Sequence, residues 1–223
     1  MSPRSLIPVL CLALLVPVVT RAQVCNGTAS FSRRHVQFFG SGAFNSATQT
    51  MDGGVGFGGT GPFGNVGVGL VHFDNLDAFA TLLHAGAGLE IPLGNSHIAY
   101  LCPSASIAHS YGPNDVDYYG DGSVILDLDE TDAAFGLGVG VIVSRPGKTQ
   151  VIPTWSIAFV NAKLTQNNTL ARTTTSDTDG FGLMTVGVGF VFSGGFSLVP
   201  TVAVPLGLSG GVVTWSVFMS VGP

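Results

Sequence analysis

The chain has 223 residues and a net charge of −5, and 9% of its residues are charged, 46% are hydrophobic and 32 are glycine. A soluble domain carries about 25% charged residues, and glycine costs about 1 kcal/mol in a helix interior, so this composition argues against a helical bundle and most α/β enzymes. The acidic balance, without any Lys/Arg cluster, excludes nucleic acid as a partner. Disorder requires low hydrophobicity and high charge, so the composition indicates an apolar, glycine-rich, all-β protein.

The first 22 residues have the features of a secretory signal peptide. Arg4 supplies the positive charge, residues 5–19 form an apolar run, and Ala22 ends a small-residue cleavage site. The apolar run is shorter than the roughly 20 residues that a membrane-spanning helix needs. We therefore predict that residues 1–22 are removed on export, and that residues 23–34 form an N-terminal segment ahead of the first strand.

Removal of the signal peptide leaves two cysteines, Cys25 and Cys102. An even number of cysteines in an exported chain predicts a disulfide, with two unpaired buried thiols as the alternative. Cys102 shares the parity of Ser104 and Ser106 in its predicted strand, so the bond would tether the segment 23–34 to the inner face of that strand.

Hydrophobic residues alternate with small ones through most of the remaining chain. Between Ala133 and Val143 the odd positions carry bulky apolar side chains, whereas three of the even positions are glycine. Strict alternation is the signature of a β-strand. With the turn signals between the alternating segments, it predicts ten strands, with eight as the other count considered, near 35–45, 48–58, 63–73, 78–92, 97–108, 131–144, 149–164, 180–193, 196–206 and 211–221.

The residues on the two faces of these strands distinguish a barrel surrounded by lipid from a soluble protein with an apolar core. A soluble β-sandwich would carry charged side chains on its outer face, but here the second face is Gly, Ala, Ser and Thr. Short turns also alternate with longer polar loops, 109–130 and 166–179 being the longest. Short turns on one rim and longer loops on the other are typical of an outer-membrane barrel. We therefore predict an antiparallel, up-and-down transmembrane β-barrel over residues 35–223.

In these features the chain resembles the small outer-membrane β-barrel, or porin-like, family of Gram-negative-type bacteria. The resemblance rests on the signal peptide, the alternation, the turn and loop asymmetry, and segments such as Val186-Gly187-Val188-Gly189-Phe190. It implies location in the bacterial outer membrane, with outer-membrane lipid and the barrel-assembly machinery as partners. Such barrels commonly end on an aromatic residue that this machinery reads, whereas Phe218 lies five residues before the end of this chain.

Few residues outside the apolar pattern suggest chemistry. The loop 109–132 carries a run of acids without Lys or Arg, which offers weak divalent-cation binding or simply a solvated surface; the candidate ligands are Asp115, Asp117, Asp121, Asp127, Asp129 and Glu130. Three polar residues are predicted to line the barrel interior: Asp52, His84 and Glu90. His84 and Glu90 lie six residues apart on one strand, roughly 20 Å, so they cannot form one site by themselves. We predict no catalytic residue and no cofactor.

A barrel lined by small residues leaves space in its centre. Either a narrow wet channel remains, or the segment 23–34 lies against or inside the periplasmic mouth. The sequence therefore predicts a non-enzymatic outer-membrane barrel that is a structural envelope component or a narrow channel for small solutes. The alternative is an exported soluble β-sandwich or a surface adhesin that binds partners through its acidic loop.

Overall fold

The computed structural model describes residues 24–28, 36–59, 61–74, 77–95, 97–114, 116–117, 125–143, 149–168, 170–207 and 211–222. The signal peptide predicted at residues 1–22 lies outside these ranges, as do Arg33, Arg34 and most of the segment 23–34. Among the described residues, the only helix is the short 3₁₀ turn η2 (Val24–Asn26), and no helix is long and apolar enough to cross a membrane.

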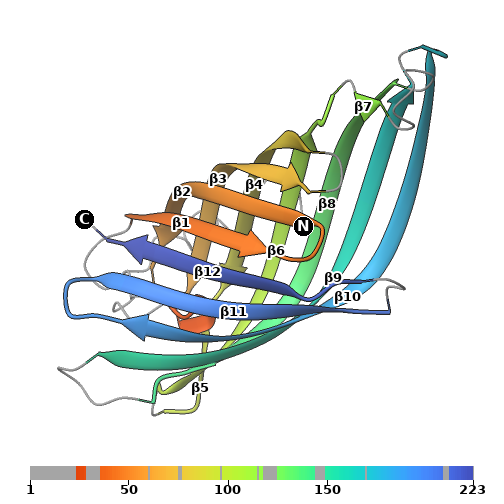
Figure 1. The fold of residues 1–223 in the computed structure, drawn as a ribbon. Helices are drawn as coiled ribbons and strands as arrows, with labels where there is room; N and C mark the ends of the chain where they lie inside the picture. The colour runs from red at the N-terminus through yellow and green to blue at the C-terminus, as the bar shows by residue number, and fades with distance from the viewer. Residues whose placement is uncertain are drawn as a thin grey trace, which may run out of the picture.

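The described strands form one antiparallel sheet that closes on itself (Figure 1). Ten long strands make the wall, and two short ones, β5 and β7, extend it. In chain order the strands are β1 (Val36–Phe44), β2 (Thr48–Gly58), β3 (Pro62–Phe73), β4 (Ala78–Leu89), β5 (Ile91–Leu93), β6 (Ala99–Tyr111), β7 (Val116–Asp117), β8 (Ile125–Val141), β9 (Gln150–Asn168), β10 (Thr173–Val191), β11 (Phe196–Leu206) and β12 (Thr214–Val221).

Closure comes from the first and last strands. Each long strand pairs with its neighbours along the chain, and β1 pairs with β12 from Phe38↔Val221 to Phe44↔Trp215. The short β5 continues β4 on β6 in the same register, so the two together form one wall strand interrupted at Glu90. The predicted up-and-down barrel of ten strands is therefore confirmed, and the soluble β-sandwich is wrong.

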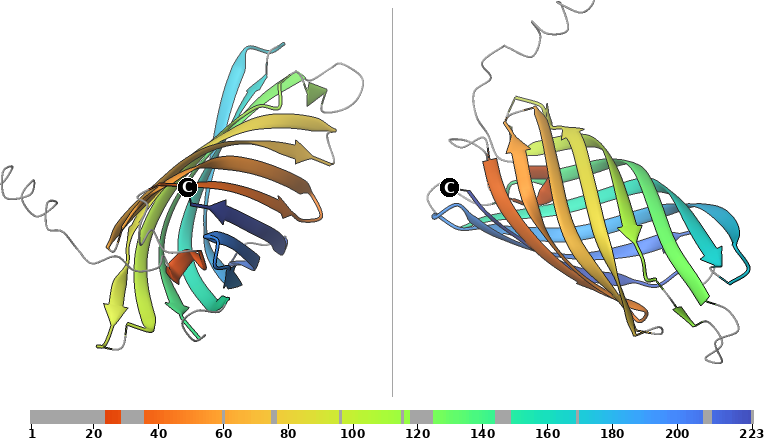
Figure 2. Two further views of the ribbon diagram at one scale, coloured as in Figure 1. Left: turned by 90° about the vertical axis from the view of Figure 1, so that its left-hand side faces the viewer. Right: turned by 90° about the horizontal axis from the view of Figure 1, so that it is seen from above.

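Two faces of the wall follow from the alternation. One side chain in two points outward, as the exposed Val66, Val68 and Leu70 of β3 show, and the residues between them point into the barrel. We call the rim at which β1 begins and β12 ends the terminal rim, and the other the opposite rim. Figure 2 shows η2 inside the barrel at the terminal rim.

Three strands are longer than their sequence pattern predicts. β8 begins at Ile125 rather than at residue 131, β9 continues to Asn168, and β10 begins at Thr173 rather than at residue 180. The predicted long loop 166–179 is thus wrong: it is mostly a continuation of β9 and β10, paired from Thr173↔Asn168 onward. β-Branched threonines at 173–175 favour strand, but their polarity hides them from a search for apolar alternation. We call this projection the arm (residues 125–132, 162–168 and 173–180); it rises beyond the opposite rim in Figure 1.

Candidate functional site

Residues 24–28 lie inside the terminal mouth of the barrel, packed against its wall. Val24 is completely buried and packs with Tyr100, Ile152 and Val191, which form the hydrophobic cluster of the described residues. Thr28 is also buried. The barrel therefore has its packed core around the N-terminal segment at one rim, and we call residues 24–28 the plug.

Two bonds hold the plug to the wall. Cys25 and Cys102 are joined by a disulfide, with their Cα atoms 6.1 Å apart. The backbone N–H of Val24 donates a hydrogen bond of 2.5 Å to Oε1 of Glu90, a carboxyl group that is buried at the break between β4 and β5. Glu90, predicted to line the interior, thus lies under the plug, and the plug covers it.

Two inward glycines make room for the plug. A Cβ built on Gly140 of β8 would overlap the carbonyl oxygen of Val24, and one on Gly189 of β10 would overlap that of Gly27. Any larger residue at these places would displace the backbone of the plug. At this rim the glycines of the inner wall therefore leave the space that the backbone of the plug occupies.

In the middle of the barrel, rings from neighbouring strands fill the space over other glycines. Cβ atoms on Gly54 and Gly67 would collide with the rings of Phe39 and His84, respectively. Phe39 also stacks on Phe218, with ring centroids 5.4 Å apart, and lies 5.9 Å from the His84 ring. The wall of small residues predicted from the sequence is thus partly lined by aromatic rings, which the period-two pattern did not single out.

Above the plug lies a cavity of about 470 Å³. Cys25 and Thr28 lie at its floor, Phe39 and Phe218 contribute aromatic surface, and Asp52 and His84 contribute titratable groups. Around them the wall is mainly hydroxyl and small side chains, among them Ser104, Ser106, Ser156, Thr185, Thr201 and Ser216. The hydroxyls of Thr201 and Ser216 are hydrogen-bonded to each other across β11 and β12.

Asp52 and His84, predicted to line the interior, meet in this cavity from β2 and β4. Oδ2 of Asp52 lies 3.6 Å from Nε2 of His84, and Oδ1 accepts a 2.8 Å hydrogen bond from the Ser41 hydroxyl. Asp52 therefore stands between the serine and the histidine. These three side chains form one polar group on the inner wall.

The acidic residues of the predicted cation loop are described only in part. Asp115 and Asp121 lie outside the described residues, as does the side chain of Asp117. On β8, Asp127 and Asp129 share one face and Glu130 lies on the other, since successive residues of a strand alternate. In the part of the chain that the structure describes, no three His, Cys, Asp or Glu side chains gather as they would around a metal ion.

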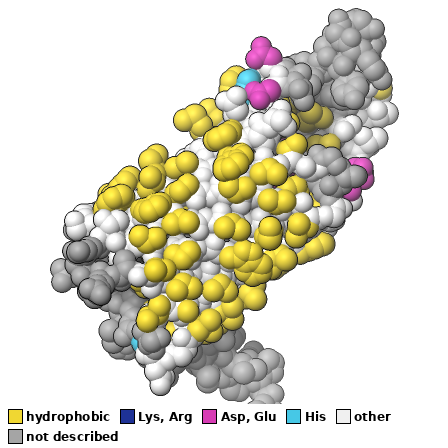
Figure 3. Space-filling view, turned by 60° about the horizontal axis from the view of Figure 1, so that its bottom comes forward, with side chains coloured by type: hydrophobic (Ala, Val, Ile, Leu, Met, Phe, Trp, Pro, Cys, Tyr) yellow, Lys and Arg dark blue, Asp and Glu magenta, His cyan; other side chains and the backbone are white. Residues whose placement is uncertain are grey.

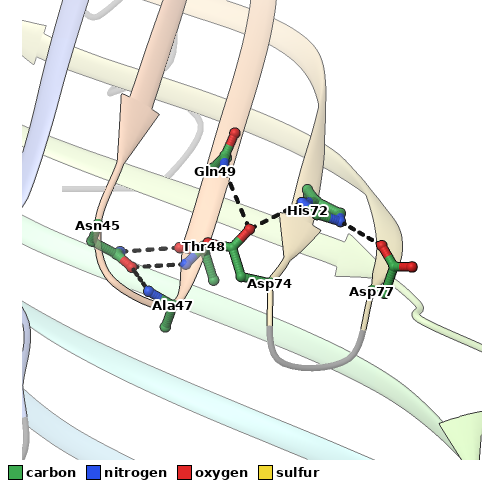
Figure 4. Close-up of polar contacts among 7 residues, drawn as sticks. All are labelled: Asn45, Ala47, Thr48, Gln49, His72, Asp74 and Asp77. Carbon is green, nitrogen blue, oxygen red and sulfur yellow. Dashed lines mark hydrogen bonds and ion pairs between the residues drawn. The ribbon is translucent and has the colours of Figure 1, made fainter.

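A polar network at the opposite rim was not predicted (Figure 4). His72 lies between two carboxylates, 3.2 Å from Asp74 and 3.4 Å from Asp77, and Gln49 donates a hydrogen bond to Asp74. The neighbouring Asn45 accepts hydrogen bonds from two backbone N–H groups of its own turn. These contacts join the β1–β2 and β3–β4 turns, and the spacing of the four residues in sequence gives no hint of them.

The outer wall is apolar over the height of the barrel. Hydrophobic side chains cover the wall in Figure 3, and the acidic side chains of that view lie toward its upper end. Exposed aromatic residues lie near both ends of several strands: Phe38, Phe57, Phe192 and Phe196 near the terminal rim, and Phe44, Phe79, Tyr111 and Trp215 near the opposite rim. Between these two groups Phe135, Trp155 and Phe159 are also exposed, but aliphatic side chains predominate.

No protein-family model matches the chain, and no curated protein sequence matches it. Among solved structures it is similar to the N-terminal β-barrel domain of Pseudomonas aeruginosa OprF (12% identity, 83% of this chain and 94% of that chain, TM-score 0.39). It is also similar to the β domain of the Bordetella autotransporter BrkA (14%, 83% and 96%, 0.41) and to a bacterial polysaccharide outer-membrane secretin (10%, 79% and 57%, 0.46).

Proposed function

We propose that this chain is a non-enzymatic β-barrel protein of the bacterial outer membrane, with its terminal rim toward the periplasm and the plug in its periplasmic mouth. The observation that carries the proposal is the outer wall. It is a closed surface of exposed apolar side chains, with aromatic residues near both ends of several strands, and such a surface suits the hydrocarbon interior of a bilayer.

The arm marks where the apolar wall ends. On β8 the outward side chains change from Phe135 and Ala133 to Asp129 and Asp127, and on β9 the outward Phe159 is followed by Asn161 and Lys163. The inward face of the arm is also largely polar, with Glu130 and Asp132 beside Leu128 on β8 and Gln166 beside Leu164 on β9. Polar and charged side chains facing outward are costly in lipid, so the proposal puts the arm beyond the membrane surface.

The plug supports an anchored envelope protein over an open channel. The side chains of Val24 and Thr28 are buried against the wall, and a covalent bond through Cys25 holds the plug there. Outer-membrane lipid and the barrel-assembly machinery are the partners that follow from this location. A narrow channel for small solutes is the second candidate, favoured by the hydroxyl-lined cavity above the plug. Adhesion through the acidic loop would involve the opposite rim, and it is compatible with both an anchored envelope protein and a narrow channel.

Conductance in a planar lipid bilayer separates the two candidates. The oxidised protein is expected to insert without a steady current, because the plug closes one mouth. Reduction, or the substitution Cys25→Ser, removes the tether and is expected to raise the frequency of brief openings. A steady current through the oxidised protein would show that it is a channel.

Detergent dependence tests the location independently. We expect the mature protein to precipitate when detergent is removed and to be recovered when lipid vesicles are supplied. A mature protein that stays monomeric in buffer alone would contradict the membrane proposal.

A further inference from the structure

One strand of the arm has an open edge. β10 pairs with β9 along its whole length. On its other side it pairs with β11 only from Gly182↔Leu206 onward, because β11 ends at Leu206. Among the described strands, none lies on that side of residues 173–181. In Figure 1 this part of β10 forms the outer edge of the arm.

The hairpin between β10 and β11 shows which backbone groups face the open edge. The N–H of Phe192, the residue after β10, donates to the carbonyl of Phe196 at the start of β11. Since successive residues of an antiparallel strand direct their backbone groups to alternate sides, the even-numbered residues of β10 face β11. Beyond the end of β11, these residues are Thr174, Ser176, Thr178 and Gly180. The Thr178 N–H donates instead to the carboxylate of Asp177 in its own strand, 2.9 Å away, which agrees with this direction.

An open strand edge is a place where another extended chain can pair with a sheet. Proteins guard such edges with lysine, proline, a bulge or a covering segment. Residues 173–181 contain neither lysine nor proline, and their pairing with β9 runs without a bulge. Residues 173–180 are all exposed, so no described segment covers them. The edge is long enough for an added strand of ordinary length, which is about five or six residues.

The charges beside this edge indicate which kind of segment fits it. Asp177 and Asp179 lie on one face of β10, and the register through β9 places Glu130 and Asp132 of β8 on the same face. Lys163 of β9 lies on the other face. An added strand would place every second side chain beside Asp177 and Asp179, where opposite charges are stabilising and like charges are not. A second copy of this edge would bring further carboxylates, whereas a segment with lysine or arginine would complement them.

We propose that the open edge of β10 in the arm binds an extended, basic segment of another protein, which adds to the sheet as a strand beside residues 174–180. Backbone hydrogen bonds along the edge supply the affinity, and basic side chains beside Asp177 and Asp179 supply the selectivity. The inference goes beyond the proposed function and rests on it in one respect, the location of the arm outside the membrane, where a partner can reach it.

The experiment measures binding of synthetic peptides to the folded, oxidised protein in detergent micelles by fluorescence anisotropy. The probe is a labelled heptapeptide in which threonine and lysine alternate. When its lysines lie beside Asp177 and Asp179, the N–H groups of its threonines face the edge of β10, and those of its lysines face away. Methylation of the threonine backbone nitrogens therefore blocks pairing at the edge, whereas methylation of the lysine backbone nitrogens does not.

We expect the unmodified and the lysine-methylated peptides to bind with similar affinity. The threonine-methylated peptide, and a peptide with glutamate in place of lysine, are expected to bind at least about tenfold more weakly. Equal affinity of the two methylated peptides would show attraction by charge alone and would overturn the proposal. Equal affinity of the glutamate peptide, or no binding of the probe at millimolar concentration, would overturn it as well. So would a dimer in micelles that is lost when residues 165–176 are replaced by Asn-Gly, because the edge would then bind a second copy.

Substitutions in the arm locate the site. Ser176→Pro removes one N–H from the open edge and is expected to weaken probe binding several fold, because proline is tolerated in a strand where its nitrogen faces no partner. The pair Asp177→Asn and Asp179→Asn is expected to have a similar effect. Asp74→Asn, at the same rim but outside the arm, is the matched control and is expected to leave the affinity unchanged.

Unchanged affinity in Ser176→Pro, or an equal loss in Asp74→Asn and in the double variant, would contradict the proposal. If Ser176→Pro does not fold, the comparison of the two methylated peptides on the unaltered protein decides. Insertion into vesicles is measured separately, so failure of the partner proposal is distinguishable from failure of the membrane proposal.

Discussion

At the scale of single residues, the glycines on the inner face have two separate uses. Gly140 and Gly189 lie beneath the backbone of the plug, whereas Gly54 and Gly67 lie beneath the rings of Phe39 and His84. In each case the missing side chain makes room for a group from another part of the chain. In the sequence the inner face is a run of small residues, but in the structure each of these glycines leaves room for a specific backbone segment or aromatic ring.

This fit makes Gly140→Ala a specific test of the plug. The added methyl group would overlap the Val24 carbonyl, so we expect the plug to be displaced at a cost of about 1–3 kcal/mol. Hydrogen exchange measured by mass spectrometry should then rise over residues 24–28. Gly138→Ala is the control: it lies on the same strand and face, and its methyl group would be 3.6 Å from Ser156 Cβ, an ordinary contact. Equal hydrogen-exchange rates over residues 24–28 in the two variants would show that Gly140 does not make room for the plug.

At the scale of elements, the strand pattern was predictable where one face is apolar and one is small. β2, β3 and β11 begin and end within a residue of their predicted bounds. β9 and β10 were predicted too short, because both their faces are polar in the arm and the alternation disappears there. The inward position of Cys102 followed from parity alone. The meeting of Asp52 with His84 did not, because it depends on the register between β2, β3 and β4, which one sequence does not reveal.

The arm is expected to be dispensable for the barrel. It lies beyond the apolar wall, and its outward residues are polar, so removing it exposes little that lipid covers. Replacing residues 165–176 by Asn-Gly would join Leu164 to Asp177, which are register partners, through a two-residue turn. We expect the free energy of unfolding in vesicles to change by less than about 1 kcal/mol. The fluorescence of Trp155 and Trp215, both in the wall, reports the transition; a variant that no longer folds would show that the arm is part of the barrel core.

At the scale of the whole molecule, large apolar side chains face outward from the wall, the reverse of their usual place in a soluble protein. The outer wall is apolar, and among the described residues the hydrophobic cluster of buried side chains is formed by Val24 of the plug and the wall residues around it. In the membrane proposed for this barrel, we expect the stability of the wall to depend on its hydrogen-bonded closure and on its fit to lipid rather than on a central core.

A charge on the outer wall should therefore be costly. Val186 is 48% exposed, points outward from β10 and pairs with Trp155 and Val202. We expect Val186→Arg to destabilise the barrel in vesicles by about 2–4 kcal/mol, as arginine does near the middle of a bilayer. Ser176→Arg, on the same face of the same strand but in the arm, is expected to cost less than about 1 kcal/mol. Urea titrations of both variants check this, and equal costs would place the membrane elsewhere on the molecule.

The bond between Cys25 and Cys102 also determines how the molecule responds to force. It closes a covalent loop with a sequence separation of 77, and β1 to β5 all lie within that loop. A pull applied to the chain ahead of Cys25 passes through the bond to β6 and does not load β1, although β1 is the next strand along the chain. Four of the ten wall strands are thus mechanically shielded from the N-terminus, and tension enters the barrel at β6, the strand that carries Cys102.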